Sequence, residues 1–403
     1  MADSFLVPMP FHGIAPFDVL VVGTGPAGNT VALTCARAGL RVLLIEREAL
    51  PRRKVCGGGL SPRALQALPL AIDPVVEQRI EGLWLGTSPQ GPLLKRLPKP
   101  GAMVRRETFD HFMALAAREA GATLEDRCAF LDFEREPGGL VRVITSQGEV
   151  RTRILVGADG VHSAVRKKAL PTCKVKTVAA IEALVEPRPE HRGMLEGRAL
   201  VDFQGIDGGY AWLFPKEGHI NAGLYRFRKT PANRDLKAVL HRFLETHPML
   251  RGGKILDLRG YEIPVQAVPA LETMDPVLLV GDAAGLAEAF FGEGIYYALR
   301  SGAAAGEAIV DALQRGGSLE AYRTWLRATG RSLLASQLTA GLFYRLPVSA
   351  IDRMVRSRFL NELFFGVLSG QVSTWRCLLA SAAAAPGWLL GHRPPAGPSD
   401  PGH

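Results

Sequence analysis

Cysteine is scarce in this 403-residue sequence, and its five cysteines are scattered singly along the chain. No two of them have the close spacing that a zinc site or an iron–sulfur cluster requires. So few cysteines in so long a chain also do not form a disulfide framework. The nine histidines show no pair with metal-ligand spacing. The sequence therefore predicts no metal centre.

Long hydrophobic runs are missing as well. The longest uncharged apolar stretch near the end, residues 377–391, is broken by Pro386 and Gly387. It is shorter than the roughly 20 residues that a membrane-spanning helix needs. The start of the sequence lacks the basic region of a secretory signal, because Asp3 comes early and the first basic residue is Arg37. We therefore expect a cytoplasmic protein, with peripheral contact at the inner face of the membrane as an alternative.

Positive charge exceeds negative charge, with 48 Lys and Arg against 39 Asp and Glu and a formal net charge of +9. Such a balance favours an anionic partner, whether a phosphate, a nucleic acid or an acidic lipid surface. The basic residues are spread through the chain, and no nucleic-acid-binding motif is present. We therefore expect no nucleic acid partner. The apolar content of 47% is ample for a buried core.

A strand, a glycine loop, a helix and a second strand open the patterned part of the chain. Residues 19–22 form an apolar run typical of a buried parallel strand, and residues 23–28 read GTGPAG. A helix over residues 26–38 and an apolar strand over residues 41–45 follow. The glycines let backbone amides approach a pyrophosphate at the helix N-terminus, and Glu46 can accept hydrogen bonds from a ribose. The predicted dinucleotide contacts are Gly23, Gly25, Pro26, Ala27, Gly28 and Glu46.

Two further motifs favour FAD over other dinucleotides. Residues 157–160 (GADG) and 281–285 (GDAAG) each follow an apolar strand. Asp282 is placed to bind a ribityl hydroxyl, and amides at the start of the next helix can meet the electron-rich flavin ring. Either aspartate alone is equally consistent with a helix cap. The three motifs together predict FAD, with contacts from Asp159, Gly160, Gly281, Asp282, Gly292, Gly294 and Ile295.

The order of these patterns predicts an α/β fold, α+β overall. After an irregular lead-in over residues 1–16, we expect a discontinuous Rossmann-like FAD-binding domain from residues 17–175 and 269–330. Alternating strands and turns over residues 176–268 predict an inserted antiparallel sheet domain that binds the substrate. Residues 331–403 predict a C-terminal helical region with a loose tail.

Three other segments carry a more specific resemblance. They are residues 54–61 (KVCGGGLS), 103–110 (MVRRETFD) and 209–216 (GYAWLFPK). With the nucleotide motifs, the chain from residue 17 to about 369 resembles the geranylgeranyl reductase family of the aromatic-hydroxylase-like FAD superfamily. The resemblance implies hydride transfer from reduced flavin to isolated double bonds of a polyprenyl lipid, diphosphate, chlorophyll precursor or quinone. It also implies NADPH or a reduced ferredoxin as the electron donor.

Cys56 is the expected catalytic residue. The resemblance places it beside the flavin, and the glycines that follow it let the backbone pass close to a flat ring. Reduction of an alkene needs a hydride at one carbon and a proton at the other, so a protonated thiol can be the proton donor. Neighbouring basic residues would instead favour thiolate, and a small buried hydrophobe is the other alternative. We also expect Gly57 and Gly58 at the cofactor.

An arginine contact to FAD is implied by the resemblance at Arg106, with Arg105 as a substitute and a surface helix arginine as the alternative. The substrate contacts come from the strand before the predicted hairpin turn. A period of two places Tyr210, Trp212 and Phe214 on one face, which either lines an apolar channel or belongs to an ordinary aromatic core. In a channel, each buried CH2 group of a prenyl chain contributes about 0.8 kcal/mol.

Lys216, at the end of that strand, either meets a diphosphate or lipid head group or is a solvated turn lysine. Apolar and basic residues mixed over the C-terminal helices suit a membrane surface or a packed helix equally. Three rival functions share this fold. They are a flavin-dependent monooxygenase or halogenase, an electron-transfer flavoprotein to quinone reductase, and a lipid carrier that retains flavin structurally. The sequence leaves the oligomeric state open.

Overall fold

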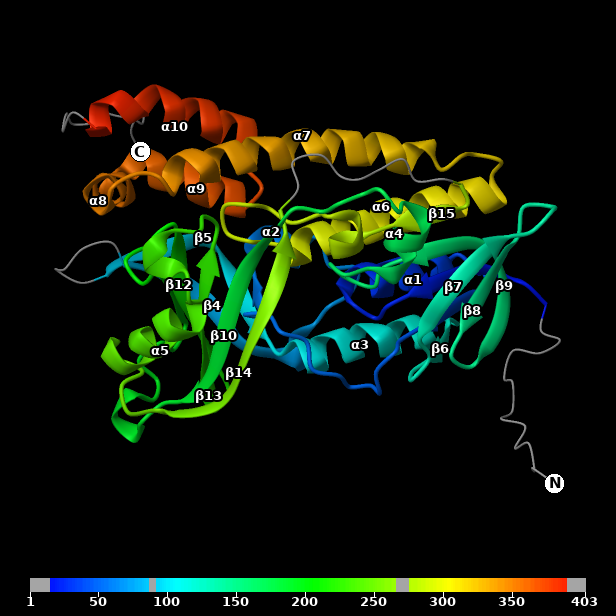
Figure 1. The fold of residues 1–403 in the computed structure, drawn as a ribbon, viewed down its shortest axis with the longest axis horizontal. Coiled ribbons are helices and arrows are strands. Elements are labelled where there is room, and N and C mark those ends of the chain that lie inside the picture. Colours follow the sequence, from blue (N-terminus) through cyan, green and yellow to red (C-terminus); the bar gives the residue numbers. More distant parts are fainter. Residues whose placement is uncertain (1–14, 87–91, 266–274, 390–403) are drawn as a thin grey trace, which may run out of the picture.

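Two β-sheets lie side by side in the computed structural model, which describes residues 15–86, 92–265 and 275–389. Figure 1 shows the two sheets next to one another, with the C-terminal helices running across one side of both. The predicted α/β class, with a nucleotide-binding domain, an antiparallel sheet and C-terminal helices, is confirmed. Of the predicted lead-in over residues 1–16, residues 1–14 lie outside the described part.

The first sheet has a parallel centre. Its order is β6-β2-β1-β9-β8-β7, and β15 pairs with β9. The strands β6, β2, β1, β9 and β15 run parallel, whereas β7, β8 and β9 form an antiparallel meander. Their bounds are β1 Phe17–Val22, β2 Val42–Ile45, β6 Thr123–Glu125, β7 Phe130–Arg135, β8 Val141–Thr145, β9 Gly148–Gly157 and β15 Val277–Leu279.

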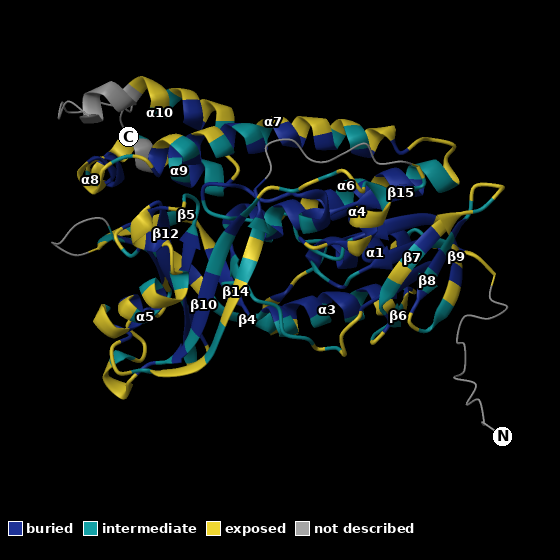
Figure 2. Cartoon of the chain, in the orientation of Figure 1, coloured by how far each residue is buried: buried dark blue, intermediate teal, exposed yellow. Residues whose placement is uncertain are grey.

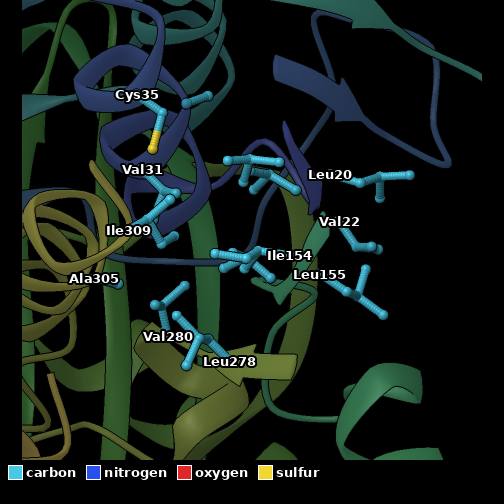
Figure 3. Close-up of a cluster of buried hydrophobic side chains, with 14 of the residues drawn as sticks. Leu20, Val22, Val31, Cys35, Ile154, Leu155, Leu278, Val280, Ala305 and Ile309 are labelled. Carbon is cyan, nitrogen blue, oxygen red and sulfur yellow. The ribbon is translucent and has the colours of Figure 1, made fainter. Parts of the chain in front are cut away.

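Helices cover the first sheet, which explains why β1 and β2 are apolar without alternation. Figure 3 shows side chains of β1, β9 and the Val277–Val280 segment meeting Val31 and Cys35 of α1 (Pro26–Arg37) and Ala305 and Ile309 of α6 (Ile295–Gln314). Two glycines let α1 and α6 pack closely. A Cβ at Gly302 would lie 2.5 Å from the carbonyl oxygen of Ala27, and one at Gly306 would lie 2.8 Å from the Thr34 side chain.

The second sheet is larger and draws on more of the chain than residues 176–268. Its order is β14-β10-β13-β12-β11-β4-β5-β3, so three of its eight strands come from residues 59–104. These three strands join the second sheet through the parallel pairing of β4 with β11. The bounds are β3 Gly59–Leu60, β4 Val76–Gly86, β5 Leu93–Val104, β10 Thr177–Glu186, β11 Arg198–Asp202, β12 Gly209–Lys216, β13 His219–Arg226 and β14 Lys254–Pro264.

The predicted hairpin in the second sheet is present. Strands β12 and β13 pair antiparallel up to Lys216 and His219, and Gly218 in the turn has φ +77°. Only glycine adopts such a left-handed conformation without strain. The domain limits that we derived from the sequence remain a prediction. The chain leaves the first sheet after β2, forms β3 to β5 of the second sheet, and returns to the first sheet at β6, after α3.

The remaining helices cover the outer faces. Figure 2 shows that buried residues concentrate between the layers, while α5 and α7 turn exposed residues outward. No helix in residues 15–86, 92–265 and 275–389 is long and apolar enough to cross a membrane. The helices not yet given are α2 Pro62–Gln66, α3 Arg106–Glu119, α4 Ala164–Ala169, α5 Leu236–Thr246, α7 Glu320–Phe343, α8 Val348–Arg356, α9 Arg358–Leu368 and α10 Thr374–Leu389.

Candidate active site

The glycine loop before α1 leaves an open, positively polarised helix end. Gly25 is the N-cap of α1, no side chain caps the helix there, and a Cβ at Gly25 would meet nothing within 4 Å. Gly23 and Gly28 are instead tightly packed, because added Cβ atoms would lie 2.6 Å from Ala158 O and 2.0 Å from Gly23 O. The free amides of the first turn, with Pro26 and Ala27 buried below them, fit a pyrophosphate.

A chain of buried charges leads away from this loop. Glu46 accepts hydrogen bonds from Thr24 N at 3.2 Å, Thr24 Oγ1 at 2.7 Å and Arg52 Nε at 2.8 Å. Burial would raise the pKa of Glu46, but Arg52 and Thr24 hold it below its ordinary value. Arg52 also binds Asp110 at 3.1 Å, and Asp110 receives two 2.8 Å hydrogen bonds from Arg106. The ionised carboxylate of Glu46 thus stands at the loop as predicted, while its ribose contact stays a prediction.

Asn29 is a part of this network that the sequence analysis did not find. Its side chain is fully buried, and its amide donates hydrogen bonds to the carbonyl oxygens of Thr24 at 2.9 Å and Asp110 at 2.8 Å. It therefore fixes the glycine loop to α3. A small residue directly after the glycine loop would leave more space there. The presence of an asparagine at this position is the signal that could have indicated a link to another element.

Cys56 lies where the network of buried charges meets the N-terminus of α6. Its sulfur accepts a hydrogen bond from Gly58 N at 3.4 Å, and the residue packs against an apolar cluster that includes Ile295, the first residue of α6. Burial would lower the pKa of Arg106, but Asp110 and Cys56 beside it raise that pKa above its ordinary value. A permanently charged guanidinium therefore stands next to the thiol. The FAD contact predicted for Arg106 remains a prediction.

Lys54 and Asp282 complete the polar surroundings of Cys56. The Nζ atom of Lys54 lies 3.3 Å from the ring centroid of Tyr261. Burial, with repulsion from Arg106, lowers the pKa of Lys54 to about 8, and attraction to Asp282 partly offsets this. Burial raises the pKa of Asp282 against the opposing effect of Lys54 and Arg106. Asp282 adjoins the α6 N-terminus, because a Cβ at Gly294 would lie 3.4 Å from its Oδ1.

The glycines after Cys56 are needed for packing against β12. Added Cβ atoms would lie 2.9 Å from the Phe214 ring at Gly57, 3.2 Å from it at Gly59 and 2.1 Å from Val104 O at Gly58. Lys216 reaches the same loop, since its Nζ donates to Val104 O at 2.9 Å and Gly58 O at 3.3 Å. The lysine is only 6% exposed. A solvated turn lysine is therefore wrong, and the predicted head-group contact has no support in this geometry.

The aromatic face predicted on β12 exists and packs on the cysteine loop. Tyr210 and Trp212 have ring centroids 6.2 Å apart, and Trp212 and Phe214 6.1 Å. The Trp212 indole donates to Asn221 at 2.7 Å, and Asn221 donates to the buried Glu182 at 3.0 Å. Packing on the Cys56 loop and fixed polar atoms thus give this face a structural role, and its contact with substrate stays a prediction.

Three tyrosines hold the segment before α6. Their hydroxyl groups donate to three consecutive carbonyl oxygens: Tyr225 to Ala289, Tyr344 to Phe290 at 2.6 Å and Tyr210 to Phe291 at 2.6 Å. The buried Glu288 accepts hydrogen bonds from the amides of Phe290 and Phe291.

Gly292 follows with φ +68°, and a Cβ there would lie 2.9 Å from the Tyr225 ring. Glu293 then binds Arg63 and Ser61 of the segment after Cys56. The N-terminus of α6 at Gly294 has no side-chain cap, which suits the flavin ring. The sequence analysis missed Tyr225, Tyr344 and Glu288, because only the fold brings them together.

An apolar pocket begins at this segment and extends under the C-terminal helices. Phe290 and Phe291 form one wall, β4 another, and α7 to α9 the roof. Phe364 and Phe365 belong to the C-terminal region in which the sequence analysis noted mixed apolar and basic residues, and neither they nor the leucines of β4 were predicted to line a substrate site. The lining residues are Leu83, Leu85, Phe203, Phe290, Phe291, Phe343, Met354, Val355, Phe364, Phe365 and Leu368.

The predicted GADG motif has a local role. Asp159 accepts hydrogen bonds from Ser163 Oγ at 2.5 Å, Ala164 N at 2.6 Å and Val165 N at 3.2 Å, so it caps α4. Its contact with FAD, and that of Gly160, stays a prediction. The amide of Gly281 donates a hydrogen bond to Ser301 Oγ at 2.9 Å. Within the described residues no cluster of His, Cys, Asp or Glu has the arrangement of a metal site.

Comparison with known proteins agrees with this geometry. Residues 16–191 match the model of the FAD binding domain family. The chain is 33% identical to digeranylgeranylglycerophospholipid reductase 2 of Methanopyrus kandleri over 74% of this chain and 78% of that protein. It is 31% identical to geranylgeranyl diphosphate reductase of Rhodobacter capsulatus, over 74% and 76%. A geranylgeranyl bacteriochlorophyll reductase-like protein from Thermoplasma acidophilum has a similar structure, with a TM-score of 0.77, 25% identity and coverage of 94% and 99%.

Proposed function

Since the chain belongs to the geranylgeranyl reductase family and is an FAD-dependent oxidoreductase, we propose that it saturates isolated double bonds of a polyprenyl substrate. Bound FAD, once reduced, supplies the hydride for this reaction. The observation that carries the proposal is the position of the apolar pocket, whose wall directly precedes the predicted flavin-binding residues in the chain. Phe290 and Phe291 line the pocket, and Gly292 directly follows them at the entrance to α6.

The pocket selects for hydrocarbon. Its lining consists of leucine, phenylalanine, methionine and valine side chains, which offer an alcohol or a charged group no hydrogen-bond partner. A polyprenyl chain loses no hydrogen bonds there and gains about 0.8 kcal/mol for each CH2 group that it buries. The backbone of Phe290 and Phe291 is fixed by Tyr344, Tyr210 and Glu288, so the wall next to the flavin site is preorganised.

We assign proton donation to Cys56. The hydride is added to one alkene carbon, and the Sγ proton of Cys56 is transferred to the other carbon, which leaves a thiolate. The positive charges of Arg106 and Lys54 beside the sulfur stabilise that thiolate. The hydrogen bond from Gly58 N and the support of Gly58 O by Lys216 keep the cysteine loop in place during the transfer.

Access from a membrane is part of the same proposal. Exposed apolar side chains gather on the helices above the pocket: Leu338 (46%) and Leu342 (56%) on α7 and Trp375 (38%) and Leu379 (66%) on α10. Arg345, just after the end of α7, is exposed and adds a positive charge near these side chains. We propose that this face contacts an anionic bilayer at the cytoplasmic side and delivers the substrate to the pocket.

The test is steady-state turnover of geranylgeranyl diphosphate and a menaquinone, with NADPH and with reduced ferredoxin as separate electron donors. The proposal expects products heavier by two hydrogens per saturated bond and no oxygen requirement. Oxygen consumption that is coupled to hydroxylation or halogenation of an added aromatic compound would instead identify a monooxygenase or halogenase. Flavin that no donor reduces would identify a carrier.

A further inference from the structure

A basic pocket adjoins the apolar pocket at its α9 end. Four cationic residues and a single carboxylate line it, together with apolar and small residues: Lys95, Arg96, Pro98, Arg356, Arg358, Glu362, Phe365, Gly366 and Gln371. Phe365 lines both pockets. The hydrocarbon-lined space and the cationic space are therefore neighbours that share one wall residue.

Strand register fixes this arrangement from the sheet side. Lys95 of β5 pairs with Leu83 of β4, and Leu93 pairs with Leu85. Because side chains alternate along a strand, Lys95 shares a face with Leu93 and Leu97, which pack on the aromatic cluster of the apolar pocket. Lys95 is thus a cation placed within an apolar row, directly opposite a residue that lines the apolar pocket.

The helix side supplies the other cations. α8 contributes Met354 and Val355 to the apolar pocket and Arg356 to the basic one, so one helical turn spans the boundary. Arg356 pairs with Asp352 at 2.9 Å and Arg358 pairs with Glu362 at 2.9 Å. Four cations thus face two carboxylates, and the pocket keeps an excess of positive charge.

The excess charge is unfavourable in the unbound protein. Burial and the nearby positive charge of Arg356 lower the pKa of Lys95. A repulsive contact between two cations is stabilised when an anion binds between them. The pocket is therefore suited to a phosphate oxygen, which accepts strong charge-assisted hydrogen bonds from arginine and lysine.

We propose that this basic pocket binds the phosphate of the substrate's head group while the prenyl chain occupies the apolar pocket. The inference rests on the proposed function and adds the place where the phosphate binds, whether that phosphate belongs to a free diphosphate or to a phospholipid in a bilayer. Lys216 does not take this role, since it is buried and donates to two carbonyl oxygens.

The experiment compares the full-length wild type with the double variant Lys95→Ala/Arg96→Ala and with Arg358→Ala, whose side chain is 88% exposed and whose loss leaves the fold intact. The control is Lys237→Ala/Arg242→Ala, which removes the same charge from exposed positions on α5. Binding of inorganic pyrophosphate is measured by calorimetry, and binding to phosphatidylglycerol vesicles by sedimentation. KM is measured for geranylgeranyl diphosphate and for uncharged geranylgeraniol.

Loss of pyrophosphate binding and a KM for the diphosphate raised about tenfold or more in the double variant, with geranylgeraniol unchanged, support a free diphosphate. Selective loss of vesicle binding supports a phospholipid. Arg358→Ala should change the same quantity in the same direction, by less. Wild-type behaviour of the double variant in both binding assays overturns the proposal. If the wild type reduces neither prenyl compound, the proposed function fails, while the two binding assays still decide the basic pocket.

Discussion

The side chain of Lys216 donates a hydrogen bond to the carbonyl oxygen of Gly58, 158 positions earlier in the chain. This contact, with a second one to Val104 O, fastens the end of β12 to the cysteine loop. The second sheet and the predicted flavin site are thereby coupled at the residue two positions after Cys56. Lys216 is a positioning residue, and its removal should disturb the loop without removing a reacting group.

Lys216→Met should lower the free energy of unfolding by about 1–3 kcal/mol, because two carbonyl oxygens lose their buried donor. Folding lowers the pKa of this lysine from 10.5 to about 8, chiefly through burial. Below about pH 8 both folded and unfolded chains carry the proton, so the buried charge has its full cost. Between pH 8 and 10.5 the unfolded chain binds more protons, and the stability contributed by Lys216 rises with pH.

Chemical unfolding of both proteins at pH 7 and pH 9.5 checks this prediction. The stability difference should move in favour of the wild type at the higher pH. Lys237→Met, exposed on α5, is the control. A stability difference between wild type and Lys216→Met that is the same at both pH values would refute the lowered pKa of Lys216.

Gly57→Ala should damage the cysteine loop through a steric clash. Its new Cβ would lie 2.9 Å from the ring of Phe214, and overpacking of this kind costs about 1–3 kcal/mol. Phe214→Leu should remove the clash, so the double variant should recover part of the activity and of the melting temperature that Gly57→Ala loses. Strictly additive losses in the double variant would show that the two residues do not contact each other in solution.

Cys56→Ser should retain bound flavin and its reduction by dithionite, while prenyl reduction falls about 10²–10⁴-fold, the usual contribution of a general acid. A serine hydroxyl is a far weaker acid than a thiol, so rescue by the conservative variant is not expected. Cys173→Ser, at a half-buried free cysteine outside the site, should keep full activity. Equal activity of the two variants would remove Cys56 from the reaction.

Met354→Trp should fill the apolar pocket, whose wall includes this side chain. We expect the rate with a four-isoprene substrate to fall about tenfold or more, and the rate with a two-isoprene substrate to fall less, because the longer chain needs more of the pocket. Flavin content should be unchanged. Leu131→Trp, at a 59% exposed position on β7, is the matched control. An equal effect on both substrates would place the prenyl chain elsewhere.

Leu342→Glu combined with Leu379→Glu should weaken binding to anionic vesicles, because both side chains are exposed on the helices above the pocket. Activity on detergent-dispersed substrate should be retained. Leu131→Glu, at a 59% exposed position on β7, tests whether any added carboxylate has the same effect. If vesicle binding survives the double substitution but is lost in Leu131→Glu, the membrane contact lies on the first sheet instead.

Local signals predicted the nucleotide-binding half. The glycine loop, Glu46 and the apolar strands lie within about 30 residues of one another, so their spacing alone indicates the βαβ arrangement. The β12 to β13 hairpin was predictable for the same reason. Strands β4 and β5 were not assigned to the second sheet, because β4, with which β5 pairs, joins that sheet through β11, more than a hundred residues later in the chain.

Long-range contacts also explain what the site prediction lacked. Leu83, Phe203 and Phe364 line one pocket only because β4, the turn after β11 and α9 converge. The sequence was consistent with Lys216 as a turn residue, because the residues next to it in the chain do not indicate that the cysteine loop covers it. The three tyrosines that hold residues 289–291 likewise come from β12, β13 and the end of α7.

Anaerobic single turnover tests the central claim most directly. The protein is reduced with dithionite, mixed with geranylgeranyl diphosphate, and followed by the visible spectrum of the flavin and the mass of the product. The account predicts that the flavin is reoxidised without oxygen and that the product gains two hydrogens per turnover. Flavin that stays reduced until oxygen enters, with the prenyl compound unchanged, would contradict it.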